Sequence, residues 1–349
     1  MKIVHITWMF TFGGIETMLV NICNEQVKLG HEVHIVVMQD GVTEKTLRKA
    51  LDQHVKVHYC HRSEGGSLLL PALRLNWLLM KLNPNVLHLH SSGIIRLIVP
   101  HKFRNIANST LHALPKKENT VAIKQVPRVF SISNAVRRAL LAYNGTDSIC
   151  NPNGIRPEFI TQRHSSEWKG CLQIVQVSRL DHADKGQHIL IQAASELRKR
   201  GYHNFIINFI GGGPSQSYLE SLVNELGLNG KIVFHGMKTQ EFIFEHLCDF
   251  DVFVQPRIRE GFGNTIAEAM AAKVPVIVSS GQGPEEVTEY GKYGYVFENG
   301  NPIDCADKLE LFLKHLNDTT FVDGGYQHVL DMYDIKVTVR KYLENYLKR

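Results

Sequence analysis

Two glutamates with seven residues between them are the most specific chemical feature of the sequence. Glu260 stands in the Gly-rich stretch REGFGN, and Glu268 follows inside a helix predicted from Thr265 to Lys273. Asn264 or Thr265 is the expected N-cap of this helix. The first backbone N–H groups of a helix have no partner within it, so the Gly263–Thr265 segment suits a phosphate group.

The two carboxylates would serve different parts of one ligand. Glu260, in the loop, could accept hydrogen bonds from sugar hydroxyls, and Glu268, nearly two turns into the helix, from ribose hydroxyls. The alternative for Glu268 is a solvated helix face. Its neighbours Ala267, Ala269 and Met270 are apolar and argue against that alternative, because a carboxylate among them needs partners.

Two cations lie in the segment VSRLDHADKGQH. Arg179 directly follows a predicted strand, and Lys185-Gly186 precedes a predicted helix. An Arg fork and a Lys point charge can together neutralise a diphosphate without a metal ion. The alternative is a pair of ordinary surface charges.

Two glycines, Gly13 and Gly14, follow the first predicted strand and open a helix in the segment GGIE. Glycine lets the backbone approach a phosphate at a helix N-terminus. The segment lacks the G-x-G-x-x-G spacing of a dinucleotide site, and a tight turn is the alternative.

The elements that must position these residues alternate between strands and helices. Strands are predicted at KIVHIT, HEVHIVVM, VKVHYC, NVLHLH and RVFSIS, and again at CLQIVQVS, NFIINFI, IVFHG, DVFVQP and VPVIVSS. Helices are predicted at 15–29, 68–82, 135–143, 187–200, 265–273 and 337–347. This alternation predicts an α/β protein with two doubly wound parallel sheets. Ligands bind beyond the carboxyl ends of such strands, where the candidate residues stand.

The 349 residues favour two domains. We predict a first domain at 1–155, a polar linker at 156–168, a second domain at 169–335 and a C-terminal helix at 336–349. Residues 1–150 contain 18 Lys and Arg against 9 Asp and Glu, whereas residues 151–349 contain 21 against 25. The basic half suggests a polyanionic neighbour, such as an anionic membrane, a phosphorylated acceptor or nucleic acid, and ordinary surface charge is the alternative.

The six cysteines form no C-x-x-C pair, which favours free thiols in a reducing compartment. Neither a signal peptide nor a membrane-spanning stretch is recognisable. We therefore expect a cytoplasmic protein.

The segments GGIE, SRLDHADKG, FIGGGP and EGFGNTIAEAMA, in this order, resemble the retaining glycosyltransferases of family 4. EGFG…E matches that family's E-x7-E motif, and NPNGI at Asn151–Ile155 resembles its interdomain segment. The resemblance implies a GT-B fold, in which two Rossmann-like domains face a cleft. The first domain would bind the acceptor and the second a nucleotide-diphosphate sugar, UDP- or GDP-linked.

The resemblance also implies site residues. Arg179 and Lys185 would hold the diphosphate, Glu268 the ribose, and Glu260 the transferred sugar, with Gly14 near the diphosphate. The backbone of the loop and helix start would contact the sugar through Gly261, Phe262, Gly263, Asn264 and Thr265. In Thr110-Leu111-His112, His112 matches a family histidine that contacts the donor sugar. His88 and His90 are competitors, which we interpret as mainly structural. Ser280–Glu286 departs from the family's G-G-x-x-E segment, so its alignment is ambiguous.

No cofactor or divalent metal is predicted. Asp249 and Asp251 look like the D-x-D of metal-dependent transferases, but they start a strand and so lie at the edge away from the ligand. The expected partners are a nucleotide-sugar donor and a glycan or lipid-linked acceptor, without nucleic acid, in cell-envelope polysaccharide or glycolipid synthesis. A nucleotide-sugar epimerase of the same fold and a non-catalytic nucleotide-sugar-binding protein remain alternatives.

The helix at 68–82 carries Arg74, Trp77 and Lys81 among leucines. Lys, Arg and Trp favour anionic membrane interfaces, so weak peripheral binding at the inner face of the cell membrane is a further hypothesis. Against it, most apolar positions of this helix are expected in the core, and Pro71 suggests that the helix starts only there.

Overall fold

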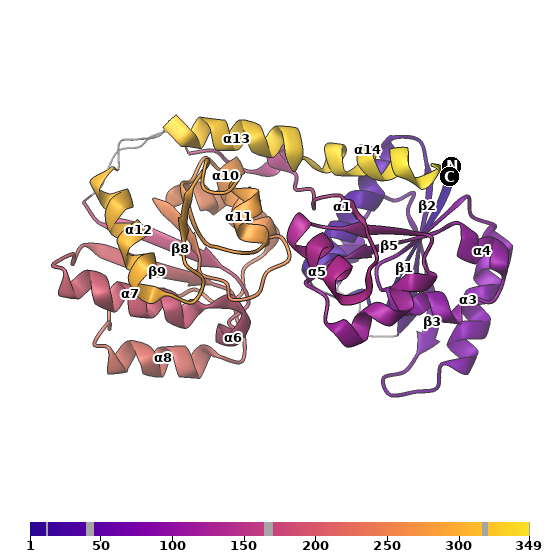
Figure 1. Cartoon of the computed structure of the whole chain (residues 1–349), viewed down its shortest axis with the longest axis horizontal. Helices are drawn as coiled ribbons and strands as arrows, with labels where there is room; N and C mark the ends of the chain where they lie inside the picture. Colours follow the sequence, from indigo (N-terminus) through magenta and orange to yellow (C-terminus); the bar gives the residue numbers. More distant parts are fainter. Residues whose placement is uncertain (12, 40–44, 164–169, 316–319, 349) are drawn as a thin grey trace. The chain divides into compact units, whose positions relative to one another are not determined.

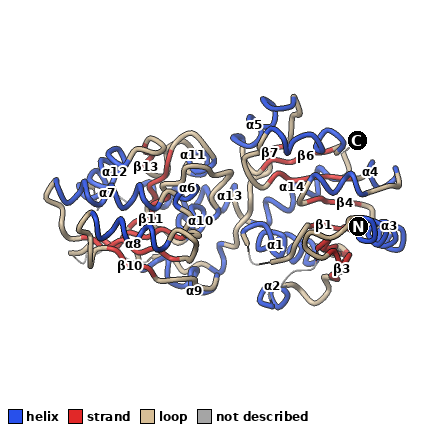
Figure 2. Tube along the Cα trace, turned by 90° about the horizontal axis from the view of Figure 1, so that it is seen from below, coloured by secondary structure: helices blue, strands red, loops and turns tan. Residues whose placement is uncertain are grey.

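The computed structural model describes residues 1–11, 13–39, 45–163, 170–315 and 320–348. The chain divides into two compact units, unit 1 (Met1–Ile155 and Asp334–Arg349) and unit 2 (Arg156–Tyr333). Each unit has one parallel sheet with helices on both faces (Figures 1 and 2). Both are Rossmann-like α/β units, as the alternation of strands and helices predicts.

Unit 1 is built on a seven-stranded sheet in the order β3-β2-β1-β4-β5-β6-β7. Its strands are β1 (Lys2–Thr7), β2 (Glu32–Gln39), β3 (Lys56–Arg62), β4 (Val86–Leu89), β5 (Ala107–Leu111), β6 (Arg128–Ser131) and β7 (Ile149–Cys150). Its helices are α1 (Gly14–Lys28), α2 (Lys45–Ala50), α3 (Leu69–Leu82), α4 (His101–Asn105), α5 (Asn134–Asn144) and α14 (Ile335–Tyr346), with 3-10 turns η1 (Ser92–Leu97) and η2 (Lys117–Gln125). The central strands β1 and β4 are buried runs, as expected of a sheet covered on both faces.

Unit 2 is built on a six-stranded sheet in the order β10-β9-β8-β11-β12-β13. Its strands are β8 (Leu172–Val177), β9 (Phe205–Ile210), β10 (Ile232–Phe234), β11 (Val252–Gln255), β12 (Val276–Ser279) and β13 (Tyr295–Phe297). Its helices are α6 (His182–Lys185), α7 (Gln187–Lys199), α8 (Gln216–Glu225), α9 (Gln240–His246), α10 (Asn264–Ala271), α11 (Gly283–Val287), α12 (Pro302–Lys314) and α13 (Thr320–Met332), with η3 (Pro157–Phe159) and η4 (Leu247–Asp249).

The strand order reverses direction once in each sheet. In unit 1 the reversal falls between β1 and β4, and in unit 2 between β8 and β11. Connections leave the two strands of each pair in opposite directions, which opens a crevice at their carboxyl ends. The segments that follow β1, β4, β8 and β11 are therefore where each unit can hold a ligand.

The last helix belongs to unit 1 although it follows unit 2 in the sequence. The Asp334 carboxylate caps α14 by accepting the N–H of Lys336 at 2.8 Å. The buried side chains of Ile335, Val339 and Tyr342 then pack in one core cluster with Ile3 of β1. Helix α14 is thus part of the unit 1 core.

The segment predicted as a linker, 156–168, is structured in its described part. The backbone N–H of Thr161 bonds to the carbonyl of Phe244 at 2.9 Å, and Arg163 forms an ion pair with Asp251 at 2.6 Å. Residues 156–163 are therefore held against unit 2, while 164–168 lie outside the described residues.

Helix α3 differs from its prediction in two respects. It begins at Leu69, so Pro71 lies inside the first turn, where its missing N–H costs no helical hydrogen bond. In addition, many of its apolar side chains are exposed, whereas most were expected in the core. Buried positions alternate with an exposed apolar stripe formed by Leu69, Leu70, Leu73, Trp77 and Met80. The prediction erred because leucines occupy both faces of this helix.

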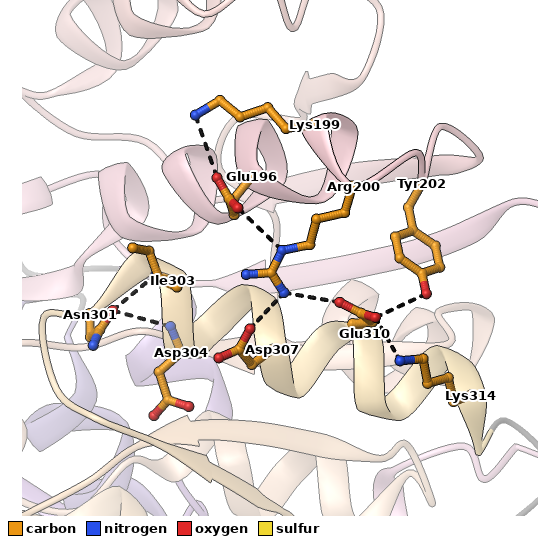
Figure 3. Close-up of polar contacts among 10 residues, drawn as sticks. All are labelled: Glu196, Lys199, Arg200, Tyr202, Asn301, Ile303, Asp304, Asp307, Glu310 and Lys314. Atoms are coloured by element: carbon orange, nitrogen blue, oxygen red, sulfur yellow. Dashed lines mark hydrogen bonds and ion pairs between the residues drawn. The ribbon is translucent and has the colours of Figure 1, made fainter.

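An ion-pair network joins α7 to α12 on unit 2 (Figure 3). The Arg200 guanidinium contacts the carboxylates of Glu196 at 3.2 Å, Asp307 at 2.6 Å and Glu310 at 3.0 Å. Lys314 and the Tyr202 hydroxyl also donate to Glu310. Because one guanidinium serves three carboxylates, we expect this network to contribute more than an isolated surface pair.

Arg200→Met should lower the stability of unit 2 by about 1 kcal/mol at pH 7. Lys314 and Arg200 lower the pKa of Glu310 from its ordinary value of 4.5 to about 2. The stability that this carboxylate contributes is therefore fully present above pH 4.5 and is lost as the pH falls toward 2. Thermal unfolding at pH 7 and pH 3 should show a smaller difference between variant and wild type at pH 3. An equal difference at both values would show that the arginine acts by packing alone.

Candidate functional site

The loop after β8 is fixed by two buried glutamines. The Gln176 amide donates to the Ser178 hydroxyl at 3.2 Å and to the Lys185 carbonyl at 2.9 Å. The Gln187 amide donates to the same hydroxyl at 3.0 Å and to the Arg179 carbonyl at 2.8 Å. These bonds join the segment that carries Arg179 to the segment that carries Lys185.

Glycine is required where this loop meets its neighbours. Gly186 has φ +68°, and a Cβ there would meet the carbonyl oxygen of Pro256, the residue after β11. Gly211, after β9, has φ +140°, and its Cβ would meet the carbonyl of Ser178. The glycines of K-G and G-G-G-P therefore let three strand ends approach one another closely.

The two predicted cations lie in this junction. Arg179 follows β8 and is 65% exposed, with one bond of 3.1 Å to Asp181, so its guanidinium can reach a ligand. Lys185 ends α6 and is half-buried. The carbonyl of the adjacent Asp184 accepts the N–H of Ile258 at 3.1 Å, which joins α6 to the loop after β11. Both cations thus stand at the β8–β11 crevice of unit 2.

The loop after β11 contains an arginine that sequence reasoning missed. The guanidinium of Arg257 contacts the carboxylate of Glu260, and both side chains are largely buried. Burial lowers the pKa of Arg257 to about 10, and Asp184 and Asp181 oppose this shift. Glu260 is therefore an oriented carboxylate with a fixed cationic partner. The only signal in the sequence was an arginine two residues beyond a strand.

Residues after β12 and β13 form hydrogen bonds to the loop after β11. Gln282 donates to the carbonyl of Ile258 at 2.7 Å and accepts the N–H of Glu260, and Asn299 donates to the Ile258 carbonyl at 3.0 Å. A Cβ on Gly283 would meet the backbone of Gly261 and Phe262. The ambiguous Ser280–Glu286 segment therefore supports the EGFG loop.

Helix α10 starts one residue earlier than predicted. Its N-cap is Gly263, with φ +104°, rather than Asn264 or Thr265. Glycine takes this left-handed conformation without strain, whereas an asparagine or threonine would not do so as readily. The Thr265 hydroxyl instead accepts from the Gln255 amide at 3.4 Å, and Phe262 packs edge-on against Tyr333. The Gly263–Thr265 segment is thus the first turn of the helix.

Glu268 lies in the second turn of α10 and is 8% exposed. Burial raises its pKa from 4.5 to about 7, and the charge of Arg156 partly offsets the shift. A carboxyl group in this setting is poised to accept hydrogen bonds from a ligand's hydroxyls. The solvated-face alternative is wrong for this residue.

Gly14 and His112 lie at the corresponding edge of unit 1. Gly14 is the first residue of α1, and a Cβ there would meet nothing within 4 Å. His112 follows β5 and is half-buried. Burial lowers its pKa to about 4, so its imidazole is neutral at physiological pH.

His88 and His90 differ in what they contact. The two nitrogens of His88 meet the Tyr346 hydroxyl at 2.7 Å and the Thr110 hydroxyl at 2.8 Å, both within the core. His90 Nδ1 lies 2.9 Å from His112 Nε2, and His90 Nε2 lies 3.1 Å from His5 Nδ1. His88 is therefore held within the core, whereas His90 contacts His112 directly.

Asp251, of the D-x-D-like pair, already has protein partners. Its carboxylate accepts from Arg163 at 2.6 Å and from the backbone N–H of Gln173 at 2.8 Å, before β11 begins. Within the ranges that the structure describes, no cluster of three His, Cys, Asp or Glu side chains could hold a metal ion. The described helices likewise include none long and apolar enough to cross a membrane.

Comparisons with known proteins agree with this architecture. Residues 12–159 match the model of "Glycosyltransferase Family 4" and residues 159–319 that of "Glycosyl transferases group 1". The structure of Anabaena HepE in complex with UDP and glucose has a TM-score of 0.83, at 19% identity over 99% of this chain and 98% of that one. The sucrose-phosphate synthase of Thermosynechococcus elongatus has a TM-score of 0.82, at 15% identity over 99% and 98%.

Curated relatives match shorter stretches. The putative colanic acid biosynthesis glycosyltransferase WcaL of Salmonella typhimurium is 30% identical over 42% of this chain and 37% of its own length. The lipopolysaccharide core biosynthesis glycosyltransferase LpsE of Rhizobium meliloti is 26% identical over 46% and 45%. Each match spans less than half of the relative.

The two parallel-sheet units, each with its polar residues at the carboxyl edge, define a protein of the GT-B fold. Over the two matched regions, residues 12–159 and 159–319, the chain is similar to glycosyltransferases.

Proposed function

We propose that the chain is a retaining, metal-independent glycosyltransferase that uses a UDP- or GDP-linked sugar. The observation that carries this proposal is the β8–β11 crevice of unit 2. There Arg179 and Lys185 stand beside the rigid EGFG loop, whose helix buries Glu268. This set offers cations for a diphosphate and a carboxylate for a ribose. The UDP in the HepE structure supports a nucleotide donor.

Arg179 and Lys185 would take up the charge of the departing diphosphate, which is the largest catalytic contribution expected here. The helix start at Gly263–Thr265 would add its backbone N–H groups. Glu268 would accept hydrogen bonds from the ribose hydroxyls. Glu260, oriented by Arg257, would accept them from the transferred sugar, which the backbone of Gly261 and Phe262 would also contact. Gly14 would approach the diphosphate and His112 the donor sugar. The leaving phosphate oxygen would take the acceptor proton.

Donor binding tests this proposal without knowledge of the acceptor. In calorimetric titration with EDTA present, we expect UDP or GDP and a corresponding nucleotide sugar to bind, and Glu268→Ala to weaken that binding. If every nucleotide and nucleotide sugar failed to bind, the proposal would be wrong. If binding required Mg²⁺ or Mn²⁺, the metal-independent part would be wrong.

For the acceptor we propose a glycan or lipid-linked hydroxyl in cell-envelope polysaccharide or glycolipid synthesis. The names of WcaL and LpsE support this class. We further propose a cytoplasmic protein that binds weakly to the inner face of an anionic membrane. Residues 65–117 contain seven Lys and Arg and no Asp or Glu, and the exposed apolar stripe of α3 lies within them.

The α3 stripe has the composition of a membrane-contacting surface. Leu69, Leu73 and Trp77 are each about 60% exposed or more, and Lys81 lies over the Trp77 ring at 5.1 Å. The Asn76 side chain joins α3 to the exposed apolar residue Val99 by accepting its N–H at 2.9 Å. An apolar ridge flanked by cations favours an anionic lipid surface, where each Lys or Arg contributes about 1 kcal/mol.

Leu73→Ser/Trp77→Ser should reduce co-sedimentation with vesicles containing anionic phosphatidylglycerol by roughly tenfold or more, because burial of either side chain stabilises binding by about 1.5–3 kcal/mol. Ile303→Ser, which changes an exposed apolar residue of α12, is the matched control and should bind as wild type. Binding should weaken with salt and with neutral lipid. No binding at low salt, or binding indifferent to lipid charge, would remove the membrane proposal.

A further inference from the structure

Three histidines of unit 1 form one hydrogen-bonded chain across neighbouring strands. His5 is in β1, His90 follows β4 and His112 follows β5, and these strands are adjacent in the sheet. His112 Nε2 lies 2.9 Å from His90 Nδ1, and His90 Nε2 lies 3.1 Å from His5 Nδ1. The chain ends at α1, where His5 Nε2 lies 2.8 Å from Gln26 Oε1. His5, His90 and Gln26 are buried.

Each link between two imidazoles needs one N–H and one bare nitrogen. Burial lowers the pKa of all three histidines well below neutrality, so each ring carries a single proton. Placing one proton therefore places all three. Only two arrangements are consistent with the links, and they run in opposite directions along the chain.

Gln26 selects between these arrangements. Its Oε1 faces His5 and can only accept, so His5 carries its proton on Nε2. The opposite amide orientation would present an N–H to His5 and reverse every link.

We infer that Gln26, His5 and His90 are positioning residues that hold His112 in the tautomer protonated on Nε2, with Nδ1 presented as a bare acceptor. Nδ1 of His112 has no hydrogen-bond partner within the described part of the chain. It can therefore accept a hydroxyl proton of a ligand. The link to catalysis rests on the proposed function, but the tautomer itself does not.

Nitrogen-15 NMR of the histidine-labelled full chain at pH 7.5 reads the tautomer directly. Long-range proton–nitrogen correlations should show His112 with a protonated Nε2 and a bare Nδ1, and His5 and His90 likewise. His112→Gln assigns the His112 signals by their loss. A wild-type His112 protonated on Nδ1, or a mixture of both tautomers, would overturn the inference. This result is independent of enzyme activity, so it also separates failure of the inference from failure of the proposed function.

Gln26→Met removes the terminal acceptor at similar volume. It should give mixed tautomers at His112 and lower kcat roughly tenfold with donor KM nearly unchanged. Tyr342→Phe is the matched control, because it removes one buried hydrogen bond of 3.0 Å, to Thr110, outside the chain. That variant should keep both the tautomer and kcat. If Gln26→Met left the His112 tautomer unchanged, or Tyr342→Phe altered it equally, Gln26 would not be the selecting group.

Discussion

Replacing either Arg179 or Lys185 with alanine should lower kcat/KM by about two orders of magnitude, the effect of removing one charge partner from a transition state. Both side chains stand in the junction of β8, α6 and the loop after β11, where Gly186 allows the backbones to touch. Under the proposed function, the departing diphosphate would develop its negative charge at this place, so a cation elsewhere on the protein could not replace either side chain.

Steady-state kinetics with a saturating acceptor measure this loss, and Lys199→Ala is the control. Lys199 lies at the end of α7 with its side chain 72% exposed, so its loss should change kcat/KM by less than about twofold. If kcat/KM of the Arg179 and Lys185 variants fell no more than that of the Lys199 control, the diphosphate would be bound elsewhere.

Glu268→Gln should raise the donor KM by roughly tenfold to a hundredfold, because a hydrogen bond to a charged group contributes about 1.5–3 kcal/mol. The pKa of Glu268 is about 7 in the unliganded protein. The ionised carboxylate is the better acceptor, so wild-type donor affinity should strengthen from pH 6 to pH 8. The variant has no such group, and its affinity should stay flat over this range.

The same substitution should stabilise the unliganded protein above pH 7. A carboxyl group whose pKa rises from 4.5 to about 7 on folding favours the folded state while protonated, and that stability is lost as the pH rises through this window. Glutamine carries no charge to bury, so the free energy of unfolding of the variant at pH 8 should exceed that of the wild type by on the order of 1–3 kcal/mol. A variant that both destabilises the protein and leaves donor KM unchanged would make Glu268 structural.

Glu260→Ala should affect the reaction differently from the Glu268 substitution. Its carboxylate is held by Arg257 at the place proposed for the transferred sugar, so its loss should lower kcat more than it raises donor KM. Equal changes in kcat and KM for the Glu260 and Glu268 variants would contradict the division of roles between the two carboxylates.

Local pattern was enough to predict the central elements. Strands such as Val276–Ser279 are short apolar runs with turn residues on either side, and the sequence order of motifs places Arg179 and Glu260 after strands. The burial of Glu268 was also predictable, because alanines and a methionine surround it in the helix.

Contacts between distant segments were not predictable. Gln282 and Asn299 support the EGFG loop only because β12 and β13 end beside β11, which no local pattern encodes. His5 looked like one more residue of a buried strand, and its link to His112 depends on the order β1-β4-β5. The exposed stripe of α3 was missed because periodicity does not distinguish which of two leucine-rich faces is covered.

The most direct test of the central claim is the stereochemistry and acceptor dependence of sugar transfer. Purified protein would be incubated with UDP- and GDP-sugars and a set of glycan and lipid-linked acceptors in EDTA, with nucleotide release and the anomeric proton coupling of the product both measured. We predict that one donor releases nucleotide only when an acceptor is present, and that the new linkage keeps the donor's anomeric configuration. An inverted product would contradict the retaining assignment, and free sugar released without any acceptor would favour an epimerase.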